Sequence, residues 1–487
     1  MEEHHRKPRP RTLTTRLICS SCIGEGYLRD EVNARGVRAV CSYCDKHLPT
    51  VTLGEMAARL DAVFDEHYML IYMGNLSEED CAMLHEVRER FGWDTRRTRP
   101  TEIICSLANI PAEPAEHLRL IIDASRRADD DRGPSSLAED DEYVRIAPDN
   151  RKLNELWDRC ERSFTTEVRH FNRRAESVLY SIFDGLTQYT TRDGKSAVIE
   201  AGPDAPLTSL FRARYFDSEA KLTTALMYPE ENLGPPPKSS LPGRMSASGM
   251  SVFYGATRQK ITIAEVQPPV GSRVLVGRFD LVRRVCLLDL EALRSVYVDG
   301  SLLDPAYNDR LRKAVFLERL SQRMTQPVTP DDAPSGYIIT QVIADYLADR
   351  EPAIDGILYP SVQASSDGYN VVLFHKSARV DIPFTFTPMR TRFQVHLGNL
   401  NDNDSRYSVL ATVPFLAPPS RECEEVAEGL YPEPNSDLRE VTLRLDRSSL
   451  AIFHIDGTTA APQSWPVEIT RVDEPVPWST RPPSQRQ

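Results

Sequence analysis

Apolar residues recur at three- and four-residue spacing through most of the first 190 residues, a pattern typical of amphipathic helices. In residues 54–72 one face carries an apolar stripe of Met56, Leu60, Val63 and Phe64. Ser77, followed by three acidic residues, predicts the N-cap of a second helix with a stripe of Met83, Leu84, Val87 and Phe91. Two shorter helices are expected over 101–107 and 117–124. Residues 51–190 are therefore expected to form a helical region.

The strongest periodicity predicts one helix from about Lys152 to Leu186. Its stripe faces a core and consists of Leu156, Trp157, Cys160, Phe164, Val168, Phe171, Ala175, Val178, Leu179, Ile182 and Phe183. The opposite face carries several arginines and His170. That face is open to two interpretations, an RNA-binding surface or a solvated helix face, and the second is the commoner for such charge. We favour the solvated face.

After Gly185 short apolar runs alternate with Pro and Gly, which is typical of an α+β domain. Residues 210–215 predict a strand in which Arg212 and Arg214 point to the same side, because side chains alternate along a strand. The segment 229–244 is rich in proline, so we expect a loop without helix, able to act as a flap. Strands are expected within 274–290, 382–397, 407–415, 441–445 and 450–455, and helices over 309–323 and 337–349.

Size and composition place the chain among multidomain globular proteins. It has 487 residues, 40% of them hydrophobic, so two to four domains are expected. The formal net charge of −12 argues against a general binder of nucleic acid or of anionic membranes. Apolar runs fall short of the roughly 20 residues of a membrane span, and the polar N-terminus lacks a signal-peptide core. We therefore expect a cytoplasmic protein with no membrane partner.

Four of the nine cysteines form two closely spaced pairs near the N-terminus. They are Cys19 and Cys22, then, after eighteen intervening residues, Cys41 and Cys44. Two CxxC pairs at this separation are typical of a zinc ribbon, in which four thiolates hold one tetrahedral ion. Such a site is closed, so the Zn²⁺ is expected to be structural rather than catalytic.

Chemistry is expected in the segment 241–266. A loop holding Arg244 leads into a short apolar run that ends at Tyr254, and Glu265 follows eleven residues later between apolar neighbours. A strand that delivers a tyrosine and a nearby carboxylate would line one pocket with an aromatic face and an acid. From spacing alone, an ordinary strand, turn and helix with a surface glutamate explains the segment equally well.

Ordered sequence blocks across about 165 residues add a resemblance to a known family. The blocks are FRAR at 211–214, PGRMSASG at 242–249, VFYGAT at 252–257, IAEV at 263–266, TQ at 340–341, DGILYPSV at 355–362 and NVVLF at 370–374. In this order they resemble a RES domain. The resemblance implies an ADP-ribosyltransferase-like α+β fold and a toxin-type enzyme that consumes NAD⁺ by phosphorolysis or hydrolysis of the nicotinamide–ribose bond, or that transfers ADP-ribose to a protein. Met245 and Ser246 depart from the family, which usually has an aromatic residue and Asn there.

The resemblance also implies roles for individual residues. The catalytic set by position is Arg212, Tyr254, Glu265 and Ser361, and the substrate-binding set is Arg214, Arg244, Gln341 and Asn370. Arg214 is also an alternative for the role of Arg212, because FRAR offers two arginines.

These residue types suit cleavage of a glycosidic bond. Loss of nicotinamide passes through an oxocarbenium-like state, which a carboxylate such as Glu265 would stabilise. Tyr254 would stack on nicotinamide, and Arg212 and Arg244 would hold the pyrophosphate. Ser361 would orient phosphate, water or a phosphate oxygen of NAD⁺. Its closest downstream histidine is His375, fourteen residues on, so a serine-nucleophile hydrolase is disfavoured.

The expected organisation has six segments. They are a disordered arm (1–16), a zinc ribbon (17–50), a helical domain (51–190), the RES domain (195–380), a β-rich extension (381–478) and a disordered tail (479–487). The helical domain with its zinc ribbon resembles the HEPN-type domains that precede RES domains. Its Arg–His pairs, Arg59 with His67 and Arg162 with His170, have seven residues between them rather than the four to six of HEPN nucleases, so we expect a non-catalytic module.

Expected partners are NAD⁺, inorganic phosphate, an antitoxin or defence partner protein, and a second copy of the chain. A protein that binds or processes RNA through the zinc ribbon and the helical arginines is the weaker alternative.

Overall fold

The computed structural model describes residues 10–71, 77–128, 137–166, 172–236, 243–246, 249–326, 337–361, 368–382, 392–397, 407–415, 437–455 and 463–475. The chain divides into two compact units. Unit 1 comprises Met1–Asp158 with Ser295–Leu320, and unit 2 comprises Arg159–Arg294 with Ser321–Gln487. The division is coarser than the six expected segments, which remain predictions. Within the described residues, no helix is both long and apolar enough to cross a membrane.

Unit 1 begins with a small module built around the paired cysteines. After α1 (Pro10–Leu13), its elements are β1 (Leu17–Cys19), η1 (Ser20–Cys22), α2 (Gly26–Arg35), β2 (Val37–Val40) and β3 (His47–Thr52). The strands form an antiparallel sheet in the order β1-β3-β2. Glu25 caps α2, because its carboxylate accepts hydrogen bonds from the backbone N–H groups of Tyr27 and Leu28.

The helices of unit 1 follow the apolar periodicity. They are α3 (Leu53–His67), α4 (Glu78–Phe91), α5 (Pro100–Ala108) and α6 (Ala112–Arg127), with a two-stranded sheet of β4 (Tyr68–Ile71) and β5 (Glu142–Arg145). Thr52 with Glu55 and Ser77 with Asp80 form capping boxes, which explains where α3 and α4 begin. Apolar residues of the cysteine module, such as Ile18 and Leu28, share one core with these helices and with Leu302–Val315. The cysteine module therefore shares its hydrophobic core with the helices of unit 1.

The expected helix from Lys152 to Leu186 is interrupted. The structure has α7 (Arg151–Thr166) and α8 (Arg173–Phe183), and Asn172 starts the second helix by accepting a hydrogen bond from the Ala175 backbone. Asn is a strong N-cap, so it favours a new helix start over continuation. The expected stripe residues Val168 and Phe171 lie outside the described residues, as does His170.

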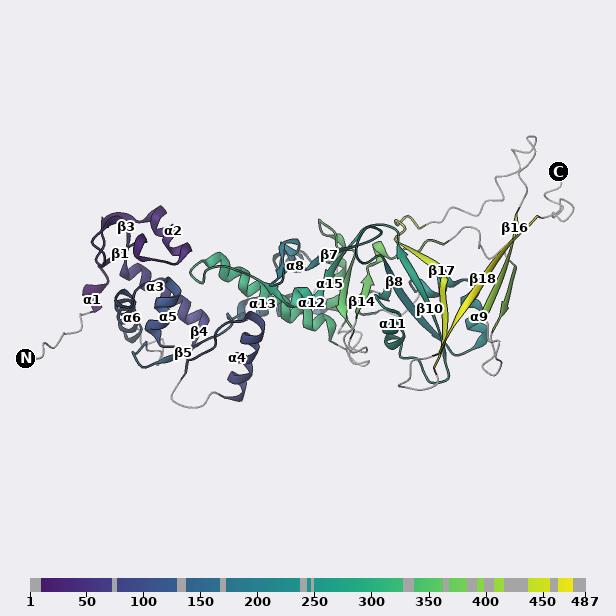
Figure 1. Cartoon of the computed structure of the whole chain (residues 1–487), viewed down its shortest axis with the longest axis horizontal. Coiled ribbons are helices and arrows are strands. Elements are labelled where there is room, and N and C mark those ends of the chain that lie inside the picture. The colour runs from purple at the N-terminus through teal and green to yellow at the C-terminus, as the bar shows by residue number, and fades with distance from the viewer. Residues whose placement is uncertain are drawn as a thin grey trace, which may run out of the picture. The chain divides into compact units, whose positions relative to one another are not determined.

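Unit 2 is built on a large mixed sheet (Figure 1). Among the described residues its order is β15-β16-β18-β17-β10-β8-β9-β14-β13-β11-β7. The strands are β7 (Val198–Ala201), β8 (Ser209–Phe216), β9 (Phe253–Ala256), β10 (Arg273–Leu281), β11 (Val285–Asp289), β13 (Gly356–Pro360), β14 (Tyr369–Leu373), β15 (Arg392–His396), β16 (Tyr407–Phe415), β17 (Leu443–His454) and β18 (Gln463–Pro475). The pairs β11–β13 and β16–β18 are parallel, and the others are antiparallel.

Both faces of this sheet bury apolar side chains. Along β10, Leu275 and Phe279 enter the larger core, whereas Val274 and Val276 enter a smaller core against Ile263 of α11 (Gln259–Glu265). This alternation follows from the two-residue period of a strand. The remaining elements that the structure describes are η3 (Leu186–Gln188), β6 (Thr190–Thr191), α9 (Glu219–Met227), α10 (Pro229–Leu233), α12 (Leu290–Arg294), β12 (Val296–Tyr297), α13 (Pro305–Thr325), α15 (Ile338–Asp349) and η4 (His375–Ser377).

The α+β fold class is confirmed, and two local expectations are corrected. The segment 229–244 does contain helix, because Pro229 opens α10: proline suits the first turn, where its missing N–H is not needed. Its residues 237–242 lie outside the described part of the chain. The expected strands 441–445 and 450–455 form one strand, β17, which pairs with β10. The C-terminal region therefore continues the central sheet (Figure 1).

Candidate functional site

A pocket of about 240 Å³ opens where five elements of unit 2 converge. Its walls come from β8, β9, α11, β13 and β14. The lining residues are Arg212, Ala213, Tyr254, Gly255, Thr262, Glu265, Val266, Tyr359 and Asn370. Four of the eight sequence-predicted site residues thus meet around one cavity, although they lie as far apart as 212 and 370 in the chain.

Glu265 is the last residue of α11, and two neighbours hold its carboxylate. The Ser361 hydroxyl donates to its Oε1 at 2.6 Å, and the Asn370 side-chain amide donates to the same oxygen at 2.7 Å. Asn370 is buried on β14, and Ser361 follows β13 directly. In the part of the chain that the structure describes, both bonds go to Oε1, so Oε2 remains for a ligand. The carboxylate is oriented before any substrate arrives.

Arg212 supplies positive charge from β8. Its guanidinium carbon lies 5.0 Å from the centre of the Phe253 ring, and its buried Nη1 has no hydrogen-bond partner among the described residues. Burial, with a smaller effect of nearby Arg214, lowers the pKa of Arg212 to about 10. A buried guanidinium nitrogen without an acceptor is costly, so the site is suited to an incoming oxygen ligand.

Tyr254 lies partly buried on the pocket wall and anchors the loop before β9. Its hydroxyl accepts a hydrogen bond from the Met245 backbone N–H at 3.2 Å, and burial raises the pKa of this phenol. A Cβ at Gly243 would lie 3.0 Å from the same hydroxyl, so a side chain there would crowd it. The ring position suits stacking on a flat ligand, and its hydroxyl fixes the Arg244 turn.

Three predicted substrate-binding residues do not line the pocket. Gln341 on α15 donates to the carbonyl oxygens of Gly243 (2.9 Å) and Ser246 (3.1 Å) and so shapes the turn that carries Arg244. Arg244 itself donates to the Met324 carbonyl at 3.1 Å, and Arg214 donates to the Asn232 carbonyl at 3.2 Å. Their side chains are committed to backbone oxygens in this conformation.

Sequence reasoning missed Tyr359 and Thr262. Burial, and secondarily the Glu265 charge, raise the pKa of Tyr359, which keeps its phenol protonated as a hydrogen-bond donor. Both residues had a local signal. Tyr359 stands two positions before Ser361 in DGILYPSV, and Thr262 precedes Glu265 by three residues, which places both on one helix face.

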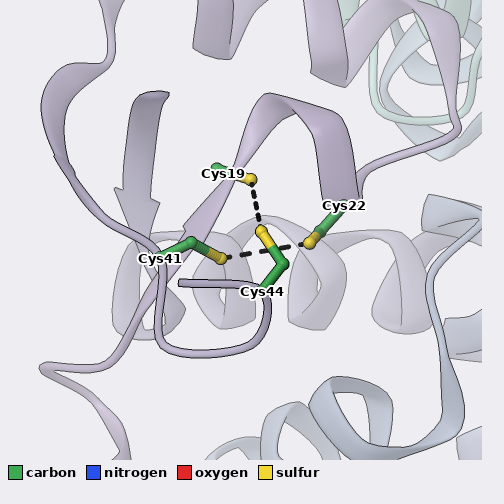
Figure 2. Close-up of side chains that lie close together, drawn as sticks. All are labelled: Cys19, Cys22, Cys41 and Cys44. Carbon is green, nitrogen blue, oxygen red and sulfur yellow. Dashed lines mark hydrogen bonds between the residues drawn. The ribbon is translucent and has the colours of Figure 1, made fainter. Parts of the chain in front are cut away.

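The four paired cysteines of unit 1 form a second cluster. Their sulfur atoms point toward one another from η1, β1 and the turn after β2 (Figure 2). Cys19 Sγ lies 3.5 Å from Cys44 Sγ, Cys22 Sγ lies 3.9 Å from Cys41 Sγ, and all four lie within 4.8 Å of one another. Sulfurs around a tetrahedral Zn²⁺ would be about 3.8 Å apart, given Zn–S bonds of about 2.3 Å. The donor set and its spacing therefore fit a metal ion.

Burial also raises the pKa of the Cys19 thiol, so a positive ion would be needed to hold it as a thiolate. The site is closed by four sulfur donors and leaves no position for substrate.

The family model of the RES domain matches residues 209–391. These residues form a RES domain. They span β8 to β14 and include all eight predicted site residues outside the cysteine cluster. No curated protein and no solved structure matches the chain. The RES domain occupies part of the central sheet, and β15, β16, β17 and β18 lie beyond it in sequence while belonging to the same sheet.

Proposed function

We propose that the RES domain consumes NAD⁺ by breaking the bond between nicotinamide and ribose. The observation that carries this proposal is the Glu265 carboxylate, which Ser361 and Asn370 hold beside a pocket that Arg212 also lines. This combination supports charge separation, with an anion beside the sugar and a cation for phosphate or hydroxyl oxygens.

The size of the pocket favours one end of the dinucleotide. Its volume of about 240 Å³ is below the roughly 300–1,000 Å³ of sites that enclose drug-sized ligands. Nicotinamide and its ribose would enter, with the ring against Tyr254 and the sugar beside Glu265. The pyrophosphate would lie toward the mouth, where Arg212, and Arg244 after release from Met324, would receive it.

In this reaction the nicotinamide–ribose bond breaks and the bonding electrons leave with nicotinamide. Glu265 offsets the positive charge that develops on the sugar, and an acceptor oxygen then bonds to the sugar carbon. Phosphate as acceptor makes the protein an NAD⁺ phosphorylase, and water makes it a glycohydrolase. By depleting NAD⁺ in a cell, the protein would act as a toxin or a defence effector.

The test is incubation of purified protein with NAD⁺, with and without inorganic phosphate, followed by mass spectrometry. Free nicotinamide with ADP-ribose 1-phosphate indicates phosphorolysis, and free nicotinamide with ADP-ribose indicates hydrolysis. ADP-ribose attached to protein would instead assign transferase activity to the same residues. Intact NAD⁺ under all conditions would refute the proposal.

We also propose that Cys19, Cys22, Cys41 and Cys44 bind Zn²⁺ as a structural ion. The sulfur-only donor set, with all four sulfurs within 4.8 Å of one another, supports this, because thiolates select soft or borderline ions. Elemental analysis of protein prepared without added metal should give about one zinc per chain. Iron in its place, or a protein that carries no metal, would contradict the proposal.

A further inference from the structure

A second and larger cavity lies in unit 2, outside the pocket around Glu265. It is a groove of about 900 Å³ between α8 and α15, and Met245, Met250, Val252 and the segment 374–376 complete its lining. Its apolar floor consists of Met245, Leu179, Val342 and Phe374. The proposed reaction on NAD⁺ uses none of these side chains, so the groove needs its own explanation.

Negative charge dominates the rim of the groove. Five carboxylates line it: Glu176, Asp184, Asp345, Asp349 and Glu351. Among the lining residues of the groove, the cations are Arg350 and Lys376, and Lys376 donates to Asp349 at 2.9 Å. Acids stand on both walls, because Glu176 belongs to α8 and Asp345 to α15. The groove therefore attracts a ligand that carries positive charge along two sides.

Exposed apolar side chains mark the same rim. Tyr180 is 62% exposed and Met250 is 39% exposed, and both line the groove. Tyr346 lines it from α15. A tyrosine ring face beside a carboxylate is a favourable binding position for a Lys or Arg side chain, which then gains both a cation–π interaction and an ion pair. Large exposed apolar residues on a concave surface are typical of an interaction site.

One turn separates this groove from the pocket around Glu265. The Met245 side chain is 4% exposed and lies on the groove floor, while the Met245 N–H donates to the Tyr254 hydroxyl in the pocket wall. Helix α15 holds this turn from the groove side: Gln341 bonds two of its carbonyl oxygens, and the Thr340 hydroxyl donates to the Arg244 carbonyl. A ligand that presses on Met245 or shifts α15 therefore acts on Tyr254 and Arg244.

We propose that the groove binds a basic amphipathic segment of a partner protein, and that binding alters the NAD⁺ pocket through the Gly243–Ser246 turn. Apolar side chains of the segment would cover the floor, and Lys or Arg on either side would reach the acids of α8 and α15. A small cation would leave the apolar floor uncovered, whereas a peptide segment can carry apolar and basic side chains together. The effect on turnover rests on the proposed function, but the binding does not.

Binding is tested on the full chain with a fluorescein-labelled peptide, KRLLKRLAKR, and its charge-inverted counterpart, EELLEELAEE, by fluorescence anisotropy. The basic peptide should bind and the acidic one should not. Glu176→Lys should weaken binding by about tenfold or more, and Tyr180→Ala by about threefold to tenfold. Glu231→Lys and Tyr27→Ala are matched controls, because both residues are exposed and neither lines the groove, and they should leave the affinity within about twofold.

Equal weakening by the control variants would show non-specific attraction to an acidic protein and would overturn the site. The chain also has a basic arm with Arg6, Lys7 and Arg9. If removal of residues 2–9 raises peptide affinity, the arm competes for the groove, and the assignment to a partner protein is overturned.

Coupling is tested by hydrogen–deuterium exchange, which requires no turnover of NAD⁺. The peptide should change exchange in fragments that contain residues 243–254 by at least about twofold, an effect that Tyr180→Ala should reduce. Unchanged exchange with saturating peptide would refute coupling and leave binding intact. If binding and exchange behave as expected while NAD⁺ stays intact, the proposed function fails and this site stands.

Discussion

The cysteine cluster and the Glu265 pocket are assembled in opposite ways. The four cysteines lie within 26 consecutive residues, and two tight turns bring their sulfurs together. The pocket collects Arg212, Glu265 and Asn370 from three elements, and the Glu265–Asn370 bond joins residues 105 positions apart. The first site is encoded by spacing and completed by an ion, and the second exists only when the sheet is formed.

Because the two sites are assembled differently, each is expected to be sensitive to a different kind of perturbation. A site made by local turns loses its geometry when its ion is removed, because little apolar core lies within the module itself. The pocket depends on strand register, since a slip of one residue would turn Asn370 away from Glu265. Perturbations of the two sites should therefore differ in kind, and this contrast can be tested.

Metal removal should give the largest effect. Cys19→Ser, or treatment with a strong chelator, should lower the melting temperature of unit 1 by about 10 °C or more, because zinc binding supplies folding free energy. Cys81→Ser is the matched control, since Cys81 is exposed and outside the cluster. Differential scanning calorimetry with zinc analysis makes the measurement. A Cys19→Ser protein that keeps its metal and melts at the wild-type temperature would contradict the proposal that the ion stabilises the cysteine cluster.

Glu265→Gln should abolish most NAD⁺ turnover. The amide keeps the shape of the side chain but loses the charge that stabilises the developing cation, so kcat should fall by about 100-fold or more. Circular dichroism should show an unchanged fold. Glu231→Gln, an exposed glutamate on α10, is the control and should retain activity. Near-normal turnover by Glu265→Gln would show that the carboxylate has no chemical role.

Unit 1 should also respond to pH through His67. This histidine is fully buried, and its burial, with the charges of Arg145 and Arg312, lowers its pKa to about 4. The unfolded chain, with a His pKa near 6.5, then binds a proton that the folded chain does not. The stabilisation is complete above about pH 6.5 and falls as pH drops toward 4, by about 3 kcal/mol at most.

Urea unfolding of the wild-type chain and of His67→Leu across this pH range measures the effect. The variant should lose most of this pH dependence, whereas His85→Asn, at an exposed position, should keep it. The same slope in wild type and His67→Leu would show that other groups titrate.

Asn370→Ala should reduce NAD⁺ turnover by about tenfold, because Glu265 loses one of two donors that orient it and each such charged hydrogen bond is worth about 1.5–3 kcal/mol. Asn370→Asp is the more informative partner: it keeps the size but places a second carboxylate beside Glu265. A reaction that tolerates Asp and not Ala would mean that Asn370 acts by filling space rather than by donating. Steady-state kinetics, with kcat and KM reported separately, distinguishes the two.

Tyr254→Phe should have the smallest effect. The ring remains for stacking, but the Met245 N–H loses its acceptor, so the turn that carries Arg244 loosens and KM for NAD⁺ should rise by about threefold to tenfold. The kcat value should change less than KM. A loss in kcat with KM unchanged would instead place the phenol in the chemical step.

Several features of this protein can be predicted from its sequence, because interactions between residues close together in the chain determine them. The cysteine spacing predicts the cluster, Thr52 with Glu55 predicts where α3 starts, and alternation places Arg212 and Arg214 on one side of β8. The ordered blocks pointed to the RES domain, which the family model confirms. In each case the relevant contacts are local, or the pattern is carried by a known family.

The tertiary structure determined how the sequence blocks of the RES domain lie relative to one another. It placed Arg212, Tyr254, Glu265 and Asn370 around one pocket, added Tyr359 and Thr262, and turned Arg244, Arg214 and Gln341 to other partners. It also paired β17 with β10, so the C-terminal region completes the sheet on which the RES domain lies. These outcomes depend on strand pairing between distant segments, whose register is set by packing on both faces and not by any one stretch of residues.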